Sequence, residues 1–339
     1  MSNPNGFSIA SSGPAATPLP SAHDLEATWR YIQDGIEVPR QPALVGDRRT
    51  ANGCRSVQQT LTVLPKHLKA IRKGAESLNE EALLKYYATE WDRYTAGANY
   101  VHRLFTYLNR HWIKREREEG HKIHTVYTLA LVQWKEHLFR YVKSKQRLAN
   151  ALLKQIEKQR NGDVIETSLV KKVIDSLVSL GLDEQDSTRL NLEVYRAEFE
   201  GYFLTATELY YKAESAAFVV ANSVVDYMKK AEARLKEEED RIELYLHVNT
   251  RANLIGVCEN VLVRDHKQML WDEFQALLDA EKSDDLYRMY TLLSRISEGL
   301  DPLREQFEAH VKRTGLAAIE KVAGESGEAM DPQHTLLPC

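Results

Sequence analysis

The feature that most constrains the fold is a long stretch without proline. Seven of the ten prolines lie at or before Pro65, and the remaining three are Pro302, Pro332 and Pro338. Proline inside a helix removes a backbone hydrogen bond and clashes with the preceding turn, whereas loops and turns accept it. The proline-free run from Lys66 to Asp301 therefore predicts packed helices with short connections, and we expect an all-α protein.

The composition is that of a soluble globular protein, with 43% hydrophobic and 28% charged residues in a chain of 339. Its net charge of -4 gives no reason to expect a nucleic acid or an anionic membrane as a partner. No apolar run reaches the roughly 18 residues that a membrane-spanning helix requires. The three cysteines are too few and too scattered for a disulfide framework or a zinc site, so we expect the cytoplasm or nucleus.

Caps and glycines divide the proline-free run into helices. Ser77 and Glu80 form an S-x-x-E capping box at the start of one helix, and Gly97 is predicted to separate that helix from the next. Gly120 is the expected end of the second helix. Apolar residues at helical spacing predict the rest, over 125–142, 145–160, 170–181, 190–221, 224–247, 250–280, 284–299, 302–314 and 316–323. About a dozen helices suit a bundle or a solenoid of helical repeats.

The stretch Ala98–Glu119 carries an unusually wide apolar face. The face comprises Val101, Leu104, Phe105, Leu108 and Trp112, and Tyr100 and Tyr107 flank it. Two readings are open from the pattern. Either core neighbours bury the helix from both sides, or one side serves the core and the other serves a partner.

The sequence offers no motif for chemistry. A phosphate-binding loop, a nucleophile elbow, a zinc-protease motif and a kinase signature are all absent. His111, His121 and His124 lie near one another but lack further ligands, so we expect no metal, no cofactor and no enzyme. Cys258 is interpreted as a small buried residue. The charged run KKAEARLKEEEDR, residues 229–241, is predicted to be a solvated helix face.

Several long segments resemble the cullin family, in the order in which cullins carry them. They are YLNRHWIKREREEG (107–120), TLALVQWKEHLFR (128–140), LLKQIEKQRNGD (152–163), YMKKAEARLKEEEDRIELYLH (227–247), LLDAEKSDDLYRMYTLLSRISEGL (277–300) and GLAAIEK (315–321). The resemblance is collinear from about Lys66 to Lys321. It is strongest to the cullin of SCF ubiquitin ligases.

The resemblance implies an elongated stalk of five-helix cullin repeats. The expected divisions are a disordered leader (1–22), a first repeat (23–163) with a divergent loop-like segment (38–63), a second repeat (164–280), a partial third repeat (281–323) and a disordered tail (324–339). In cullins a C-terminal half binds a RING protein and carries the lysine that Nedd8 modifies. We expect that half to lie outside this chain, and hence no RING partner for it.

The resemblance also implies a binding site. In cullins the second and fifth helices of the first repeat bind an adaptor, which in SCF complexes is a Skp-family protein that carries an F-box receptor. The fifth helix corresponds to Ala98–Glu119, and its predicted adaptor contacts are Tyr100, Arg103, Leu104, Tyr107 and His111. Segment 38–63 does not match the second helix, so half of the site is expected to be missing or replaced.

The expected function is a non-catalytic scaffold arm in ubiquitin-dependent protein degradation. Two alternatives stay open. One is a helical tether or rod-like interaction protein without a ubiquitin role, and the other is a truncated product without function.

Overall fold

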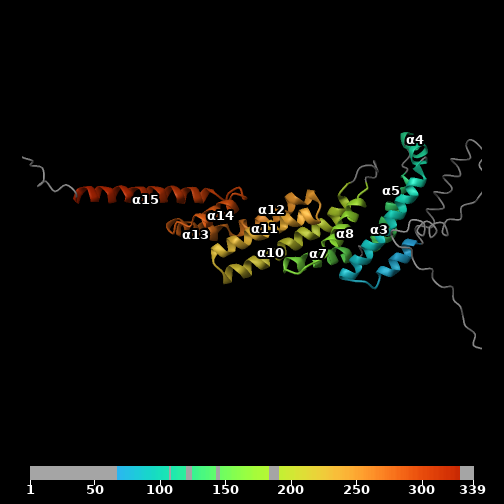
Figure 1. Cartoon of the computed structure of the whole chain (residues 1–339), viewed down its shortest axis with the longest axis horizontal. Coiled ribbons are helices and arrows are strands. Elements are labelled where there is room, and N and C mark those ends of the chain that lie inside the picture. The colour runs from blue at the N-terminus through green and yellow to red at the C-terminus, as the bar shows by residue number, and fades with distance from the viewer. Residues whose placement is uncertain (1–66, 107, 120–123, 143–145, 183–190, 329–339) are drawn as a thin grey trace, which may run out of the picture. The chain divides into compact units, whose positions relative to one another are not determined.

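The computed structural model describes residues 67–106, 108–119, 124–142, 146–182 and 191–328 (Figure 1). These residues form helices and short connections with no β-strand among them, which confirms the all-α class. None of the described helices combines the length and the apolar content needed to cross a bilayer. The predicted leader 1–22, segment 38–63 and Tyr107 lie outside the described residues.

The helices group into two compact units. Unit 1 comprises residues 1–151 and 179–191, and unit 2 comprises 152–178 and 192–339. These units do not test the predicted division into cullin repeats, which stays a prediction.

Unit 1 is organised by the packing of α3 along α5. Thr125 begins α5 as predicted, because its hydroxyl accepts a hydrogen bond from the Thr128 N–H at 3.2 Å and satisfies a free donor of the first turn. The described elements of the unit are a helical stretch over 67–75, α3 (Glu80–Leu104), η1 (Leu108–Ile113), α4 (Lys114–Glu118), α5 (Val126–Trp134), η2 (Lys135–Phe139), α6 (Arg140–Val142) and the start of α7 (Arg147–Arg160).

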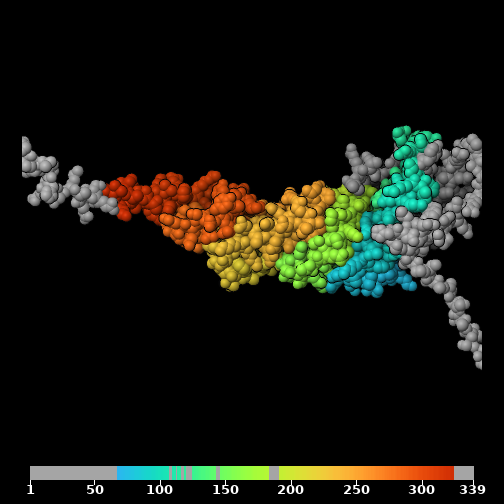
Figure 2. All heavy atoms as spheres, viewed as in Figure 1, coloured from blue at the N-terminus to red at the C-terminus, as the bar shows by residue number. Residues whose placement is uncertain are grey.

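Unit 2 is built around three helices that lie side by side, α10, α11 and α12 (Figure 1). The next helices, α13 to α15, pack together, and their atoms form one continuous surface from orange to red in Figure 2. The elements that follow α7 are α8 (Thr167–Ser179), α9 (Glu193–Tyr195), η4 (Arg196–Glu200), α10 (Gly201–Ala221), α11 (Val224–Leu244), η5 (Val248–Thr250), α12 (Arg251–Leu262), η6 (Arg264–His266), α13 (Lys267–Asp279), α14 (Ser283–Leu293) and α15 (Asp301–Glu328).

The apolar stripes read from the sequence form the cores. In α7 the apolar residues at helical spacing, Leu148, Leu152 and Ile156, are all buried. The same holds for the predicted residues of two further helices, which are Val170, Val173, Ile174 and Leu177 of α8 and Tyr227, Met228, Ala231, Leu235 and Ile242 of α11. Side chains three and four residues apart share one helix face, so a stripe at this spacing is buried as a unit.

Three predicted helix boundaries were wrong. α3 runs through Gly97 to Leu104, and Gly97 is buried within it. Likewise α15 runs through Gly315 to Glu328, so it absorbs the predicted short helix and residues 324–328 of the predicted tail. A glycine inside a helix costs only about 0.5–1 kcal/mol relative to alanine, and at the buried Gly97 the packing of α3 outweighs this cost. The predicted helix 250–280 divides at Val263 into α12 and α13.

The predicted capping box was also wrong in register. α3 begins at Glu80 with Asn79 at the N-cap, two residues later than the box requires. The preceding residues are held by Arg147, whose guanidinium donates to the backbone carbonyls of Ala75 at 2.9 Å, Glu76 at 3.3 Å and Leu78. A cation on these carbonyls satisfies the acceptors that the helix over 67–75 leaves unpaired at its end.

Buried tyrosines make the fold sensitive to alkali. Burial raises the pKa of Tyr94, Tyr211, Tyr227 and Tyr245, and it raises the pKa of Tyr195 to about 12. An exposed tyrosine in the unfolded chain titrates near pH 10. The folded state therefore favours the protonated tyrosines. Their contribution to the free energy of unfolding is fully present below about pH 10 and is lost as the pH rises toward 12.

We therefore expect the helical circular-dichroism signal to collapse on titration from pH 9 to 12. The Tyr195→Phe variant, which removes one titrating group, should lose stability less steeply over the same window. A helical signal that stays unchanged up to pH 12 would contradict this expectation.

Candidate protein-binding surface

The inner side of α3 is fixed by an aromatic cluster around Trp134, the last residue of α5. Trp134 is fully buried, and the rings of Tyr87, Trp91 and Tyr94 lie 5.6, 5.3 and 4.9 Å from its ring centroid. The indole N–H of Trp134 donates to the Tyr87 hydroxyl at 3.2 Å, and the Tyr94 hydroxyl donates to the Ala130 carbonyl at 2.8 Å. Aromatic packing with satisfied polar atoms makes α3 a rigid support.

The end of α3 is tied to the start of α5 through Asn109 in η1. The Asn109 amide donates to the His102 carbonyl at 3.2 Å, and its side-chain oxygen accepts from the Val126 N–H at 3.4 Å. The Thr106 hydroxyl donates to the Arg103 carbonyl at 2.6 Å. A hydroxyl bound to a carbonyl of the preceding turn competes with the helix ladder.

These contacts explain why the predicted helix Ala98–Glu119 is not continuous. The last residues of α3 are followed by a turn at Phe105, the π-helical η1 and the short α4. The prediction of one helix over this stretch was therefore wrong. Single π-helical turns often mark functional positions.

Four of the five predicted adaptor contacts lie in the described residues. Tyr100, Arg103 and Leu104 occupy the end of α3, and His111 lies in η1. Leu104 is 53% exposed, Arg103 and His111 are exposed, and Tyr100 is half-buried. The fifth contact, Tyr107, lies outside the described residues.

The outer side of this region is suited to contact with a protein. An exposed leucine on a rigid helix, bordered by cations, offers an apolar anchor with a polar rim. Among the described residues no group of three or more His, Cys, Asp or Glu side chains could hold a metal ion.

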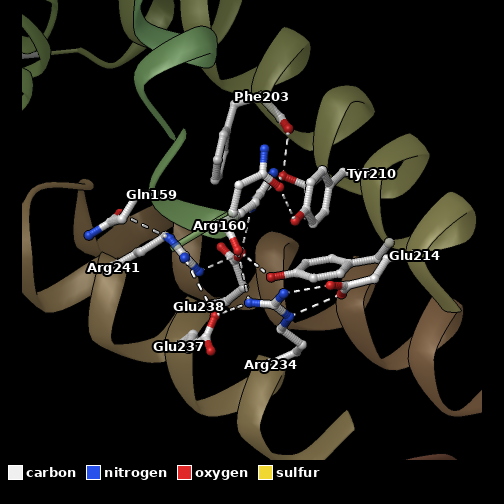
Figure 3. Close-up of polar contacts among 12 residues, drawn as sticks. Gln159, Arg160, Phe203, Tyr210, Glu214, Arg234, Glu237, Glu238 and Arg241 are labelled. Atoms are coloured by element: carbon white, nitrogen blue, oxygen red, sulfur yellow. Dashed lines mark hydrogen bonds and ion pairs between the residues drawn. The ribbon is translucent and has the colours of Figure 1, made fainter. Parts of the chain in front are cut away.

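A second constellation, in unit 2, was missed by the sequence reasoning. Glu238 of α11 is completely buried, and its Oε1 accepts hydrogen bonds from Arg160 Nε at 2.8 Å, Arg241 Nη1 at 2.8 Å and the Tyr211 hydroxyl at 2.5 Å (Figure 3). Its other oxygen, Oε2, has no hydrogen-bond partner within the described part of the chain. Three helices, α7, α10 and α11, thus meet on one carboxylate.

Neighbouring side chains complete this ionic cluster. Arg160 also donates to the Thr207 hydroxyl at 2.8 Å, and its guanidinium lies 5.2 Å from the ring centroid of Tyr211. Burial and the Glu238 charge raise the pKa of Tyr211, so its hydroxyl stays protonated and donates. Gln159 accepts from Arg241 at 3.2 Å (Figure 3). It also accepts from the Tyr245 hydroxyl at 2.7 Å.

The position of Arg160 follows from how α7 ends. Gly162 adopts a positive φ of 94°, a left-handed conformation that glycine accepts without strain and that terminates helices. The Gly162 N–H donates to the Gln159 carbonyl at 3.1 Å, and the Asp163 N–H donates to the Lys158 carbonyl at 3.0 Å. The predicted end of this helix at residue 160 is confirmed.

The prediction that residues 229–241 form a solvated face was wrong for part of the run. Glu238 and Arg241 are buried, and Arg234 binds Glu214 of α10. The sequence did carry the signal, because Glu238 falls three residues after Leu235 and four before Ile242, on the apolar stripe of α11. A charge on a buried stripe predicts a paired charge inside the core.

Comparison with known proteins gives the family. A family model described as the Cullin alpha solenoid domain matches residues 44–336. The chain is 50% identical over 306 residues to Cullin-1 of Dictyostelium discoideum, which covers 88% of this chain and 40% of that protein. It is 39% identical over 275 residues to Cullin-1 of Schizosaccharomyces pombe, covering 80% and 36%. It is 33% identical over 338 residues to Cell division control protein 53 of Saccharomyces cerevisiae, covering 88% and 41%.

The chain therefore spans about two-fifths of the length of these relatives. The matched range begins inside segment 38–63 and runs to residue 336, so it is longer than the resemblance drawn from the motifs between Lys66 and Lys321. The described residues within it form an all-helical chain, as a helical solenoid requires. Because the family model matches most of the chain, the chain belongs to the cullin family.

Proposed function

We propose that this chain acts as a scaffold arm of an SCF-type ubiquitin ligase, in the cytoplasm and nucleus, without a catalytic role of its own. The proposal is supported by membership of the cullin family and by the similarity to Cullin-1 proteins. A scaffold that holds a substrate receptor and a ubiquitin-charged conjugating enzyme on one frame raises their effective concentration. The arm's partner is a Skp-family adaptor that carries an F-box receptor.

The observation that carries the proposal is the exposure of Leu104. It is the one large aliphatic or aromatic side chain that is more than half exposed among the described residues of unit 1. The opposite side of the same helix is locked onto Trp134. An apolar side chain held in water by a rigid support is typical of an interface anchor.

The Leu104→Glu variant is expected to weaken binding of the Skp-family adaptor with its F-box protein about 30-fold, because interface anchors contribute roughly 2 kcal/mol or more. The affinity is measured by titration of the full chain with the purified adaptor complex. Leu209→Glu is the matched control, since Leu209 is 64% exposed on α10 in unit 2.

The control should bind as tightly as the unaltered chain. Equal affinity of the Leu104→Glu and unaltered chains would exclude this surface as the docking site. If the unaltered chain does not bind the adaptor complex at all, the scaffold proposal fails.

A further inference from the structure

The surface around Leu104 lies in the middle of a stretch without acidic residues. Between Asp92 and Glu116 the chain has no aspartate or glutamate, although the whole chain contains 49 acidic and 45 basic residues. The same stretch contains five cations, which are Arg93, Arg103, Arg110, Lys114 and Arg115. A chain with a net charge of -4 therefore has a locally positive segment at the predicted docking site.

The structure leaves much of this charge uncompensated. Arg103 and Arg110 are exposed, and neither has an ion-pair partner among the described residues. Arg93 pairs with Glu90 at 3.0 Å, but Lys114 approaches Glu118 only at 3.9 Å, between side chains that are more than half exposed. Exposed pairs of this kind contribute little, so the field of the cations reaches solvent.

Several other exposed cations pair more closely. Lys85 lies 2.7 Å from Glu81, Lys212 lies 2.6 Å from Glu208, and Lys312 lies 2.6 Å from Glu308. Arg103 lies in the last turn of α3, where a positive charge also offsets the helix dipole. That explanation does not extend to Arg110, because the helix continues from η1 into α4.

We propose that this surface recognises a protein whose contact face presents an apolar socket bordered by carboxylates. The socket takes Leu104, and the carboxylates pair with Arg103 and Arg110. This inference rests on the proposed function and specifies the chemistry of the partner. Complementary charges around an apolar anchor steer the encounter and exclude partners with a basic rim.

A protein fits the surface better than a nucleic acid does. Leu104 would place apolar surface against a charged phosphate backbone, which has no matching group.

The test is the rate of association with the Skp-family adaptor–F-box complex, measured with the full chain at low and high salt. The Arg103→Glu/Arg110→Glu variant should associate about tenfold more slowly at low salt, because charge complementarity acts mainly on the association rate. For the unaltered chain the rate should fall with rising salt, and for the variant it should be nearly flat. The Arg103→Gln/Arg110→Gln variant, which only neutralises the charges, should lie between them.

The Lys236→Glu/Lys282→Glu variant is the matched control. It makes the same change in net charge at two exposed lysines of unit 2 that have no ion-pair partner among the described residues. Its association rate should stay within twofold of that of the unaltered chain.

Different outcomes separate the two proposals. Tight binding that neither salt nor the arginine changes affect would overturn this inference and leave the scaffold proposal standing. Lack of adaptor binding by the unaltered chain would overturn both. Binding of a single-stranded RNA oligonucleotide that the arginine changes abolish, with adaptor binding intact, would overturn the inference in favour of a nucleic-acid surface.

Discussion

Replacing Glu238 with alanine is expected to lower the free energy of unfolding of unit 2 by about 3–5 kcal/mol, the usual cost of leaving a buried charge unpaired. The Glu238 side chain is fully buried, and those of Arg160 and Arg241 are 3% and 4% exposed. Without the carboxylate, two guanidinium groups and the Tyr211 hydroxyl would lose their shared acceptor in the core. A loss of this size is a large share of the roughly 5–15 kcal/mol that stabilises a typical domain.

The effect is measured by urea unfolding of the full chain, followed by circular dichroism. Glu208→Ala is the matched control, because Glu208 pairs with Lys212 on the exposed face of α10 and should contribute only about 0.3–0.5 kcal/mol. Glu238→Gln, which keeps the shape of the side chain and removes its charge, should lie between the two. An unfolding midpoint of Glu238→Ala equal to that of Glu208→Ala would show that the ionic cluster does not stabilise unit 2.

The second large effect is expected in unit 1. Trp134→Ala should cost about 3–5 kcal/mol, the range for truncating a buried aromatic side chain to alanine. The change removes the ring against which Tyr87, Trp91 and Tyr94 pack, and it leaves the Tyr87 hydroxyl without its donor. Because these three residues belong to α3, the support beneath Leu104 should loosen as well.

Two measurements check this expectation. Urea unfolding gives the loss of stability, and adaptor titration should show weaker binding although Trp134 is buried and cannot touch a partner. Trp134→Phe keeps an aromatic ring in the cluster. It should therefore lose less stability and less adaptor affinity than Trp134→Ala. Full stability of Trp134→Ala would contradict the central place of the cluster in unit 1.

The class of fold and most of the core could be predicted from the sequence. The missing prolines and the apolar stripes of α7, α8 and α11 depend on local rules, and the structure follows them. Glycine was a poorer guide. Gly162 ends α7 in a left-handed conformation, whereas Gly97 and Gly315 lie inside continuous helices. Gly97 is buried by packing partners distant in sequence, which a local pattern does not contain. Gly315 lies among exposed residues, so packing does not account for its place in α15.

The partners of the buried charge in unit 2 also could not be predicted from a local pattern. Glu238 sits on the apolar stripe of α11, so its burial could have been inferred, but its partners could not. Arg160 lies 78 residues away in the chain, and Tyr211 lies 27 away. Two of the segments that resemble cullins, 152–163 and 227–247, are joined by this ionic cluster.

The candidate docking surface was only partly predictable. Tyr100, Arg103 and Leu104 share the end of α3 as their spacing requires, and Leu104 and Arg103 are exposed. The interruption of the helix after Leu104 was not foreseen, since it arises from Thr106 and from the contacts of Asn109 with α5. The assignment of these residues to adaptor binding stays a prediction.

Hydrogen exchange of the backbone amides shows directly where the adaptor docks. The full chain is compared alone and with the Skp-family adaptor–F-box complex. Docking on the surface around Leu104 predicts slower exchange in peptides from 98–119, with no change in peptides from α10 and α14. Binding that slows exchange in those unit 2 helices and leaves 98–119 unchanged would contradict docking on the surface around Leu104.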